Sequence, residues 1–398
     1  MPVLFKERRS ENRFSVQKFF RVLFWIGLTG ALIEFAVLLA LLYFRSQPVE
    51  LPQPTGEYAV GRTAFVWEDE LRVDPLVPGG NPRELLVWVW YPAERAENAE
   101  PAEYLPEKWL LAREKRLSTS AFMLQDPATV RSHAVQDASP AAEPQRFPVL
   151  IFAPGYGSIA PDYTALAEDL ASRGYIVAGV TPTGSASVVV FPDGREVTQT
   201  ADGSIYGGRG EEGRQALKRS AGRLVRVWAE DMRFVLDQLA VLNAAPGPFH
   251  DRIDVERAGF FGHSFGGATS AEVCRTDGRC KAGADLDGTL FGDVLVTGLN
   301  RPFFFMWSHA EGREDIIAAR QIYDQLPEGS CWTEMDGLGH LNYHDIAAQF
   351  ALVHHLSGAL GDLDGREGLN VIRDSLALFF DYHLKDSGIG PCQSDLDL

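Results

Sequence analysis

Short apolar segments alternate with helix-forming segments along this chain from Pro148 onward. The apolar segments are uniformly hydrophobic rather than hydrophobic at every second residue, and they include PVLIFAP, YIVAGV, AGFFG, AGADL and PFFFMW. Such runs fit strands that are buried on both faces, and helices between them join strands that run parallel. The sequence therefore predicts an α/β fold in which helices cover both faces of a mostly parallel sheet.

Composition excludes several other classes of protein. Apolar residues make up 45% and charged residues 23% of the 398 residues, as in globular proteins. The net charge of −17 argues against a nucleic-acid partner, because a surface that binds phosphates needs an excess of Lys and Arg. The 4 cysteines include no CxxC pair, which excludes a zinc ribbon, and they are too few for a disulfide scaffold.

Residues 22–44 form an apolar run that only Glu34 interrupts with a charge. A helix over this run reaches roughly 34 Å, which is enough to cross a hydrocarbon core of about 30 Å. Basic residues are concentrated before the run, and only Arg45 follows it before Arg62. Because positive flanks stay in the cytoplasm, we expect a single-pass anchor with the remaining chain periplasmic or extracellular. A cleaved signal peptide is less favoured, since the apolar run is long and lacks an Ala-x-Ala site.

The charge distribution also bears on the lipids that such a chain could handle. The basic residues before the apolar run mean that the remaining chain is more acidic than the total of −17. Anionic lipid headgroups would repel such a domain. We therefore expect any lipid that this domain handles to be zwitterionic or neutral.

The sequence divides into four parts. Residues 1–21 are predicted to be a cytoplasmic basic tail, residues 22–44 the transmembrane anchor, residues 45–56 a proline-containing extended linker, and residues 57–398 one α/β domain. Within this domain, residues 93–146 are rich in Ala, Glu and Pro and are interpreted as an insertion or cap.

A candidate nucleophile lies in the segment GFFGHSFGGAT, which contains Gly262-His263-Ser264-Phe265-Gly266. In a Gly-x-Ser-x-Gly turn a strand reverses sharply into a helix, and glycine is needed where the backbones crowd together. The serine hydroxyl is then exposed at the C-terminal end of the strand. The pattern is weak by itself in a chain with 38 glycines, but a predicted strand precedes it and a predicted helix of small residues follows it.

A serine hydroxyl needs a general base, and the base needs an acid to orient it. In folds with this turn the chain order is serine, acid, histidine. Asp287 follows the next predicted strand, with Asp285 as a rival two positions earlier, and His340 lies in the loop DGLGHLN after a later strand. Catalytic groups collect at the carboxyl ends of parallel strands. We therefore predict Ser264, Asp287 and His340 as the catalytic residues.

Other histidines offer alternatives. His263 beside the serine is interpreted as a packing residue, and His309 is the alternative base. His340 and His344 are four residues apart, a spacing that could hold zinc, but the chain lacks the HExxH pattern. We therefore predict a reaction that needs no metal and no other cofactor.

Several segments extend the similarity beyond this turn to one known family. They are FAPGYGS, LAEDLASRGYIVAGV followed by GSAS, FFGHSFGGAT, RCKAGADLDG, PFFFMWS and GHLNYHDI. From about Pro148 to about Tyr382, and more weakly back to Pro54, the chain resembles the plasma-type platelet-activating factor acetylhydrolases, also called lipoprotein-associated phospholipases. The resemblance implies an α/β-hydrolase fold.

The resemblance also implies roles for individual residues. By position, the family's nucleophile, acid and base fall on Ser264, Asp287 and His340. An oxyanion hole is implied from the backbone N–H groups of Phe265 and Tyr156, which would stabilise the charge that develops on the substrate carbonyl oxygen.

Together these features predict a serine-dependent carboxylic ester hydrolase that forms an acyl-enzyme, with short or oxidised acyl esters of phospholipids, or related lipophilic esters, as substrates. A broad carboxylesterase or polyester hydrolase is the alternative within the enzyme class. A non-catalytic adhesion ectodomain is less favoured, because a fold alone does not fix function but all three catalytic candidates are present. The expected partners are the lipophilic substrate and, through the N-terminal helix, the membrane.

The cysteines predict two disulfide bonds if the domain lies in an oxidising compartment. Cys274 and Cys280 flank the short polar loop RTDGR between a predicted helix and the next strand. Cys331 begins a later strand, and Cys392 lies in a polar C-terminal tail that has little apolar material to hold it. We therefore expect Cys274–Cys280 and Cys331–Cys392, with four reduced thiols as the alternative.

Overall fold

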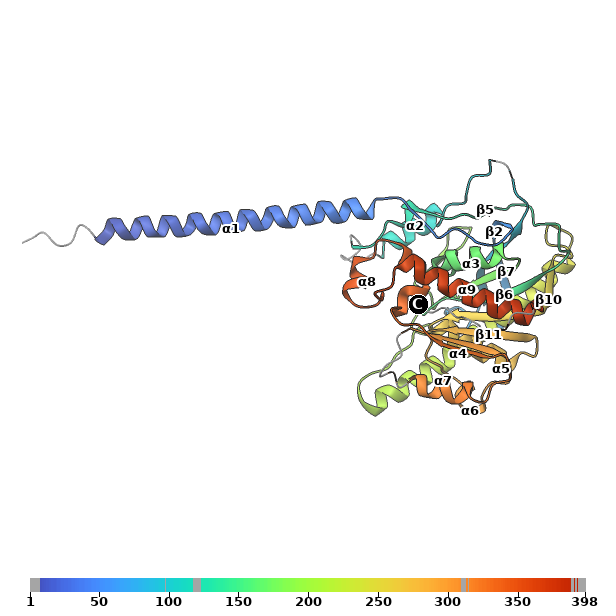
Figure 1. Cartoon of the computed structure of the whole chain (residues 1–398). Coiled ribbons are helices and arrows are strands. Elements are labelled where there is room, and N and C mark those ends of the chain that lie inside the picture. Colours follow the sequence, from blue (N-terminus) through green and yellow to red (C-terminus); the bar gives the residue numbers. More distant parts are fainter. Residues whose placement is uncertain are drawn as a thin grey trace, which may run out of the picture.

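A long N-terminal helix, α1 (Arg8–Arg45), projects from an α/β body in this computed structural model (Figure 1). The structure describes residues 8–96, 98–116, 123–308, 313, 315–387, 390 and 392. Helix α1 begins in the basic segment, before the predicted start of the apolar run at residue 22. In the described part of the chain it is the one helix long and apolar enough to cross a membrane, over Val16–Arg45.

Within the described residues, one sheet contains nine strands. In spatial order these are β13 (Cys331–Glu334), β12 (Phe303–Trp307), β11 (Cys280–Leu286), β10 (Ile253–His263), β6 (Phe147–Ala153), β7 (Ile176–Thr181), β3 (Pro82–Ala93), β2 (Ala59–Val73) and β5 (Val135–Gln136). The strands from β13 to β7 run parallel, whereas β3 is antiparallel to both β7 and β2. The predicted mostly parallel α/β sheet is therefore confirmed.

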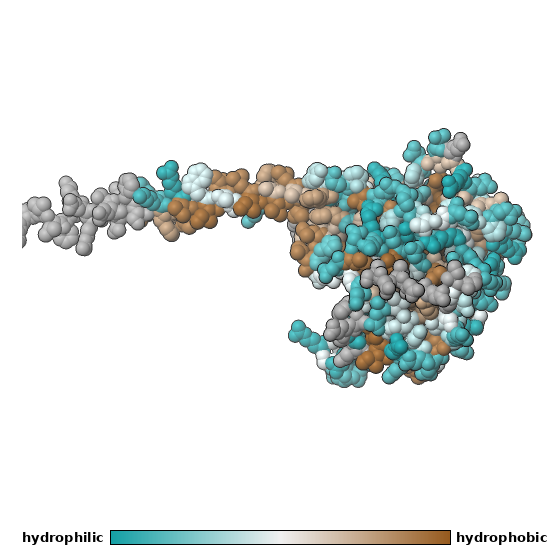
Figure 2. All heavy atoms as spheres, viewed as in Figure 1, coloured by the Kyte–Doolittle hydropathy of each residue, from teal (hydrophilic) through white to brown (hydrophobic). Residues whose placement is uncertain are grey.

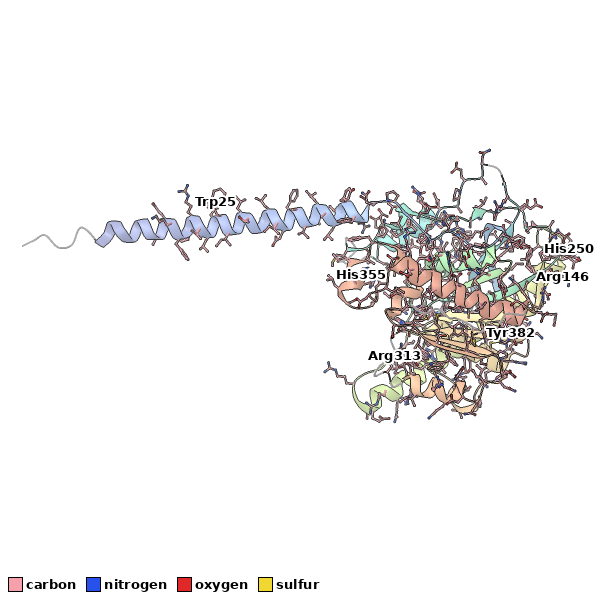
Figure 3. The ribbon with its side chains drawn as sticks, viewed as in Figure 1. Trp25, Arg146, His250, Arg313, His355 and Tyr382 are labelled. Carbon is pink, nitrogen blue, oxygen red and sulfur yellow. A yellow bond between two sulfur atoms is a disulfide. The ribbon has the colours of Figure 1, made fainter. Side chains whose placement is uncertain are left out.

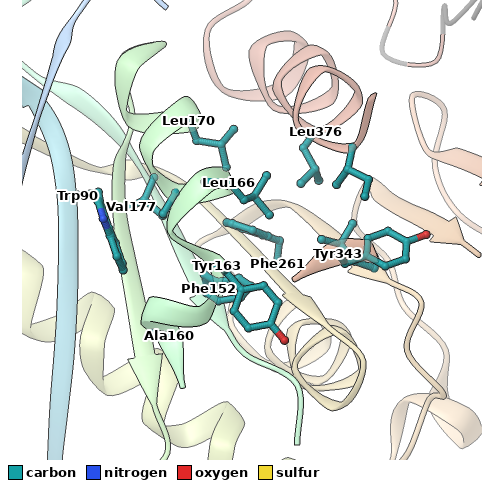
Figure 4. Packing of buried hydrophobic residues seen from close by; sticks show 14 of the residues in the cluster. Trp90, Phe152, Ala160, Tyr163, Leu166, Leu170, Val177, Phe261, Tyr343 and Leu376 are labelled. Atoms are coloured by element: carbon teal, nitrogen blue, oxygen red, sulfur yellow. The ribbon is translucent and has the colours of Figure 1, made fainter. Parts of the chain in front are cut away.

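Helices cover both faces of the sheet, which explains why its central strands are apolar throughout. All residues of β6, β7 and β12 are buried. One face packs against α3 (Thr164–Ser172) and α9 (Gly365–Leu384), through residues such as Leu166 and Leu376 (Figure 4). The other face packs against α4 (Gly210–Ala244), α5 (Phe265–Thr276) and α7 (Asp315–Tyr323).

Smaller elements lie around this framework. The described residues of the segment 93–146 lie beside the β2 edge of the sheet, where β5 pairs with β2, and they contribute buried side chains such as Trp109 to the core. The polar stretch before α4 contains a hairpin that the sequence does not predict. The remaining elements are β1 (Val49–Glu50), α2 (Glu107–Glu114), η2 (Pro127–Thr129), β4 (Val130–Arg131), η3 (Ala160–Tyr163), β8 (Val188–Val190), β9 (Glu196–Thr198), α6 (Val294–Thr297), η4 (His340–Tyr343), η5 (Asp345–Ala348) and α8 (Leu352–Leu356).

The segment between α1 and the body is bound to the body along its length. The backbone N–H and the hydroxyl of Thr55 both donate to one carboxylate oxygen of Asp169, at 2.9 and 2.8 Å. The Arg373 guanidinium donates to the backbone carbonyl of Gln53 at 2.7 Å. The predicted linker therefore has fixed partners on α3 and α9 rather than acting as a free tether.

The cysteines form the two disulfide bonds that the sequence predicts. Cys274–Cys280 connects the C-terminal half of α5 to the start of β11. Cys331–Cys392 connects the first residue of β13 to the C-terminal tail.

Candidate active site

Ser264 lies in a sharp turn between β10 and α5, where the backbone leaves little freedom. Its φ of 54° is unusual for a residue with a side chain, and its N–H donates to the carbonyl of Leu286 at 2.8 Å. A Cβ at Gly262 would lie 2.2 Å from the carbonyl carbon of Gly266, and one at Gly266 would lie 2.0 Å from the carbonyl oxygen of Ala153. Both glycines of the motif are therefore required by backbone contacts, as the sequence pattern indicates.

His340 contacts the serine from the other side of the site. It is the first residue of η4, in the loop that follows β13. Its Nε2 lies 3.0 Å from Ser264 Oγ, and its side chain is 45% exposed. This distance is within the range for proton transfer from the hydroxyl to the imidazole.

Asp287 holds the other nitrogen of this imidazole. Its Oδ2 lies 2.6 Å from His340 Nδ1, and its Oδ1 accepts a hydrogen bond from the Ser308 N–H at 3.1 Å. The Asp287 side chain is fully buried, at the point where the chain leaves β11. The structure thus brings together the three residues that the sequence predicts, in one hydrogen-bonded chain from carboxylate to hydroxyl.

Arg313 is a neighbour of this site that the sequence analysis missed. Its guanidinium binds Oδ1 of Asp287, forms a second ion pair with Asp315 at 2.9 Å, and lies 4.9 Å from the centre of the Trp307 ring. Arg313 is one of the residues labelled on the α/β body in Figure 3. No motif surrounds Arg313, so the only available signal was a basic residue shortly after a strand that borders the site.

The charge state of Asp287 follows from these contacts. Burial acts to raise the pKa of its carboxyl, but the hydrogen bond from His340 and the charges of His340 and Arg313 outweigh it. The pKa of Asp287 is therefore lowered, and the group is an anion at neutral pH.

The rival carboxyl, Asp285, occupies a different environment. It lies behind the start of α5, where a Cβ on Gly267 would be 1.8 Å from its Oδ1, and that oxygen accepts the Gly288 N–H at 2.9 Å. Burial, reinforced by the negative charge of Asp287, raises the pKa of Asp285 well above its ordinary value. It is Asp287 that contacts His340.

His263, beside the serine, is a packing residue as predicted. It is buried, with Nδ1 at 2.8 Å from the Tyr163 hydroxyl and Nε2 at 2.8 Å from the backbone carbonyl oxygen of His340. Burial, together with the neighbouring His340, lowers its pKa well below the ordinary value. His263 is thus a neutral ring that supports the loop carrying His340, and Tyr163 extends this contact into the core (Figure 4).

Two alternatives from the sequence concern other histidines. His309, the alternative base, lies outside the described residues. The Nε2 of His344 lies 3.5 Å from a carboxylate oxygen of Asp162, and its Nδ1 accepts the N–H of Ile346 at 3.0 Å. Among the described residues, no group of three His, Cys, Asp or Glu side chains is arranged to hold a metal ion.

The two residues predicted to supply the oxyanion donors lie in different segments of the chain. Phe265 is the first residue of α5, so its N–H has no acceptor within the helix. Tyr156 lies in the turn after β6, where the Ser158 N–H donates to the carbonyl of Gly155 at 2.9 Å. The rings of Tyr156 and Phe265 lie 6.2 Å apart, so the two segments that carry the predicted oxyanion donors are neighbours.

Comparison with known proteins places this chain in a family. The sequence profile described as "Platelet-activating factor acetylhydrolase, isoform II" matches residues 43–216 and 237–389, which is most of the chain. The chain belongs to this family. Its activity is therefore ester hydrolysis, as the sequence predicts.

Individual members of the acetylhydrolase family are distant in sequence. The platelet-activating factor acetylhydrolase of Bos taurus is 24% identical over 362 residues, which cover 84% of this chain and 77% of the relative. A probable 1-alkyl-2-acetylglycerophosphocholine esterase of Arthroderma benhamiae is 25% identical over 267 residues, which cover 61% of this chain and 62% of that protein. A solved ferulic acid esterase from Streptomyces cinnamoneus is 32% identical, with a TM-score of 0.68, and the match covers 85% of this chain and 94% of the esterase.

Tyr156 also connects the turn after β6 to another part of the chain. Its hydroxyl accepts the N–H of Ile205 at 2.8 Å, and so attaches this turn to the segment before α4.

Proposed function

We propose that Ser264, His340 and Asp287 are the catalytic residues of this ester hydrolase. The observation that carries the proposal is the continuous chain of contacts, with 2.6 Å between Asp287 and His340 and 3.0 Å between His340 and Ser264. A nucleophile with a base in reach, and a base oriented by a buried anion, is the arrangement that activates a serine hydroxyl.

In the proposed reaction, Ser264 Oγ attacks the ester carbonyl carbon while its proton passes to His340 Nε2. The tetrahedral intermediate collapses, the carbonyl–alkoxy bond breaks, and His340 returns the proton to the leaving alcohol. Water then attacks the acyl-enzyme with His340 again as base, which releases the acid and restores Ser264. Asp287 stabilises the imidazolium and holds the ring in position.

The backbone N–H groups of Phe265 and Tyr156 would stabilise the negative charge on the carbonyl oxygen in both tetrahedral intermediates. Donors that are fixed by the backbone need no reorganisation as this charge develops. The position of Phe265 at the start of a helix, and that of Tyr156 in a tight turn, support this role.

We propose short or oxidised acyl esters of phospholipids as the substrate class. The names of the curated relatives support a short acyl group on a glycerophosphocholine. The net charge of −17 supports a zwitterionic rather than an anionic lipid. A broad carboxylesterase is the second candidate, because the ferulic acid esterase is more similar in sequence, at 32%, than these relatives.

Comparison of substrates tests this proposal. The full chain in detergent micelles should hydrolyse 1-alkyl-2-acetylglycerophosphocholine with a higher kcat/KM than a long-chain phosphatidylcholine or methyl ferulate. The Ser264→Ala variant should hydrolyse none of them and should lose labelling by a fluorophosphonate. A clear preference for methyl ferulate would favour the carboxylesterase instead. Hydrolysis at the parent rate by Ser264→Ala would contradict the catalytic assignment.

We further propose that α1 is an uncleaved single-pass anchor with its N-terminus cytoplasmic and the catalytic domain periplasmic or extracellular. The basic residues before the apolar run support this orientation. The exposed apolar side chains of α1, which run up to the body in Figure 2, support the anchor. Protease added to spheroplasts, in which only the cytoplasmic membrane is intact, should degrade the catalytic domain. Protection until that membrane is lysed would reverse the orientation.

A further inference from the structure

The end of α1 is fixed to the catalytic body. The backbone carbonyl of Arg45, the last residue of α1, accepts hydrogen bonds from the Gln125 side chain and the Asp126 N–H, both at 3.1 Å. The ring of Phe44 stacks on that of Phe350, with centroids 5.8 Å apart. Given the proposed anchor, these contacts set both the height and the orientation of the body relative to the membrane.

A cavity of about 310 Å³ lies beside this contact. Its lining includes Arg45, residues of α2 and the segment that holds the end of α1, among them Leu110, Arg113, Glu114, Leu124 and Asp126. The apolar run of α1 ends at Phe44, so Arg45 lies where the helix leaves the hydrocarbon core. The headgroup layer is only about 5–7 Å thick on each side of that core. The cavity therefore lies at the level of the lipid headgroups.

The lining carries both signs of charge next to apolar groups. Arg45 and Arg113 supply cations, and Glu114, Asp126 and Asp162 supply anions. Arg113 pairs with Asp162 through both Nη atoms, at 2.8 and 3.1 Å, and its side chain remains 27% exposed. A phosphate can therefore approach the arginines while an ammonium group approaches the carboxylates, and the leucines can contact the glycerol end of the lipid.

We propose that this cavity binds the headgroup of an intact zwitterionic phospholipid of the membrane, whose acyl chains remain in the bilayer. The inference rests on the proposed anchor. An anionic headgroup has no ammonium group to bind the carboxylates of the cavity. An uncharged headgroup has no phosphate to bind its arginines. The bound lipid is distinct from the lipid that is hydrolysed, because neither Ser264 nor His340 lines the cavity.

Such a lipid would fix the edge of the body that carries the catalytic histidine. The loop from His340 continues through η5 to Phe350, which contacts α1, and α1 leaves the body beside α2 and α8 (Figure 1). The headgroup site and the attachment of α1 would thus together hold this edge against the membrane surface.

Lipid retention by the full chain tests the proposal. The background is Ser264→Ala, and the probe is an ether-linked dialkyl phosphatidylcholine, so that neither esterase activity nor lipid hydrolysis enters the result. Native mass spectrometry from detergent should show one retained phosphatidylcholine, bound about tenfold more tightly than dialkyl phosphatidylglycerol. Equal retention of both lipids would indicate general contact with the apolar helix and would overturn the proposal.

Two variants locate the site. Ala128→Trp, at an exposed position in the cavity lining, should fill the cavity and weaken phosphatidylcholine retention about tenfold, while Ala244→Trp at the exposed end of α4 should not. Glu114→Lys should shift the preference toward phosphatidylglycerol, whereas Glu107→Lys on the same helix, outside the lining, should leave it unchanged. Unchanged retention and preference in both cavity variants would overturn the site.

Hydrolysis of p-nitrophenyl acetate by the chain with Ser264 intact is measured separately. Its absence would contradict the proposed function without affecting the retention result. If the chain has full esterase activity but its Ser264→Ala variant retains no phosphatidylcholine, the headgroup site is wrong and the proposed function is unaffected.

Discussion

The two sides of the active site are positioned by different kinds of contact. On the nucleophile side, backbone atoms fix Ser264, because the glycines before and after it leave no room for a side chain. On the acid–base side, His340 and Asp287 come from separate loops and meet through side-chain contacts, with Arg313 as a further partner. The nucleophile side is thus determined by contacts between backbone atoms. The acid–base side depends instead on contacts between charged and polar side chains.

The largest expected loss of activity comes from removing the side chain of Ser264 or that of His340, which contact each other between the two sides of the site. Ser264→Ala and His340→Ala should each lower kcat by roughly 10⁴- to 10⁶-fold, because such residues act as one unit. Both variants should keep the parent's circular dichroism spectrum and melting temperature to within a few degrees. If His340→Ala retained more than a small fraction of p-nitrophenyl acetate hydrolysis, the base would have to be another residue, with His309 as the first candidate.

The two aspartates near the end of β11 provide a matched pair. Asp287→Asn should lower kcat roughly 10⁴-fold, because the amide cannot support the imidazolium. Asp285→Asn should keep activity within about tenfold, because Asp285 contacts backbone rather than His340. Steady-state kinetics of both variants decides the assignment, and the reverse order of effects would make Asp285 the acid.

Asp285 should also make the free energy of unfolding depend on pH. Its pKa is raised by burial in the folded state, so it binds more protons there than in the unfolded chain. Its contribution therefore lowers the free energy of unfolding as the pH rises above about 4, the ordinary value for aspartate. Urea unfolding at several pH values should show a smaller loss of stability between pH 4 and 8 for Asp285→Asn than for the parent. An equal or larger loss would mean that Asp285 is ionised in the fold.

Arg313 tests whether charge tunes the acid–base side. Arg313→Gln removes the cation that shares the carboxylate of Asp287 with His340, so the anion acts more strongly on the imidazole. The acidic limb of the kcat/KM profile should then move to higher pH, with kcat near its optimum changed by less than about tenfold. Arg320→Gln, a change to an exposed arginine on α7, is the control. An unshifted profile would assign Arg313 a purely structural role.

The two disulfide bonds should differ in their effect on stability. Loss of Cys331–Cys392, which closes the longer loop, should cost about 4 kcal/mol, and loss of Cys274–Cys280 about 2 kcal/mol. Urea unfolding of the paired Cys→Ser variants measures both. A larger effect for Cys274–Cys280 would contradict the assumption that loop length governs the difference.

No effect is expected from chelation. EDTA should leave p-nitrophenyl acetate hydrolysis unchanged, because the proposed reaction uses only Ser264, His340, Asp287 and backbone donors. If EDTA abolished turnover and a divalent ion restored it, the metal-free mechanism would be wrong.

The sequence alone determined those features that depend on neighbouring residues. The turn around Ser264 was predictable because the Gly-x-Ser-x-Gly pattern is local: the serine takes a positive φ, and a Cβ at Gly262 would meet the backbone of Gly266. The buried strands and the apolar helix α1 were predictable because uniform hydrophobicity over a given length has few structural solutions. The pairing of Cys274 with Cys280 also follows from their short separation, since few residues lie between them.

Only the tertiary structure decided what depends on the path of the chain between distant segments. It added Arg313 to the carboxylate of Asp287, and it attached the segment after α1 to α3 and α9. It also placed α2 and the segment around Gln125 at the end of α1. Side-chain contacts of this kind span from tens to hundreds of residues, and a shift of an ångström in either loop breaks them, so no local pattern in the sequence encodes them.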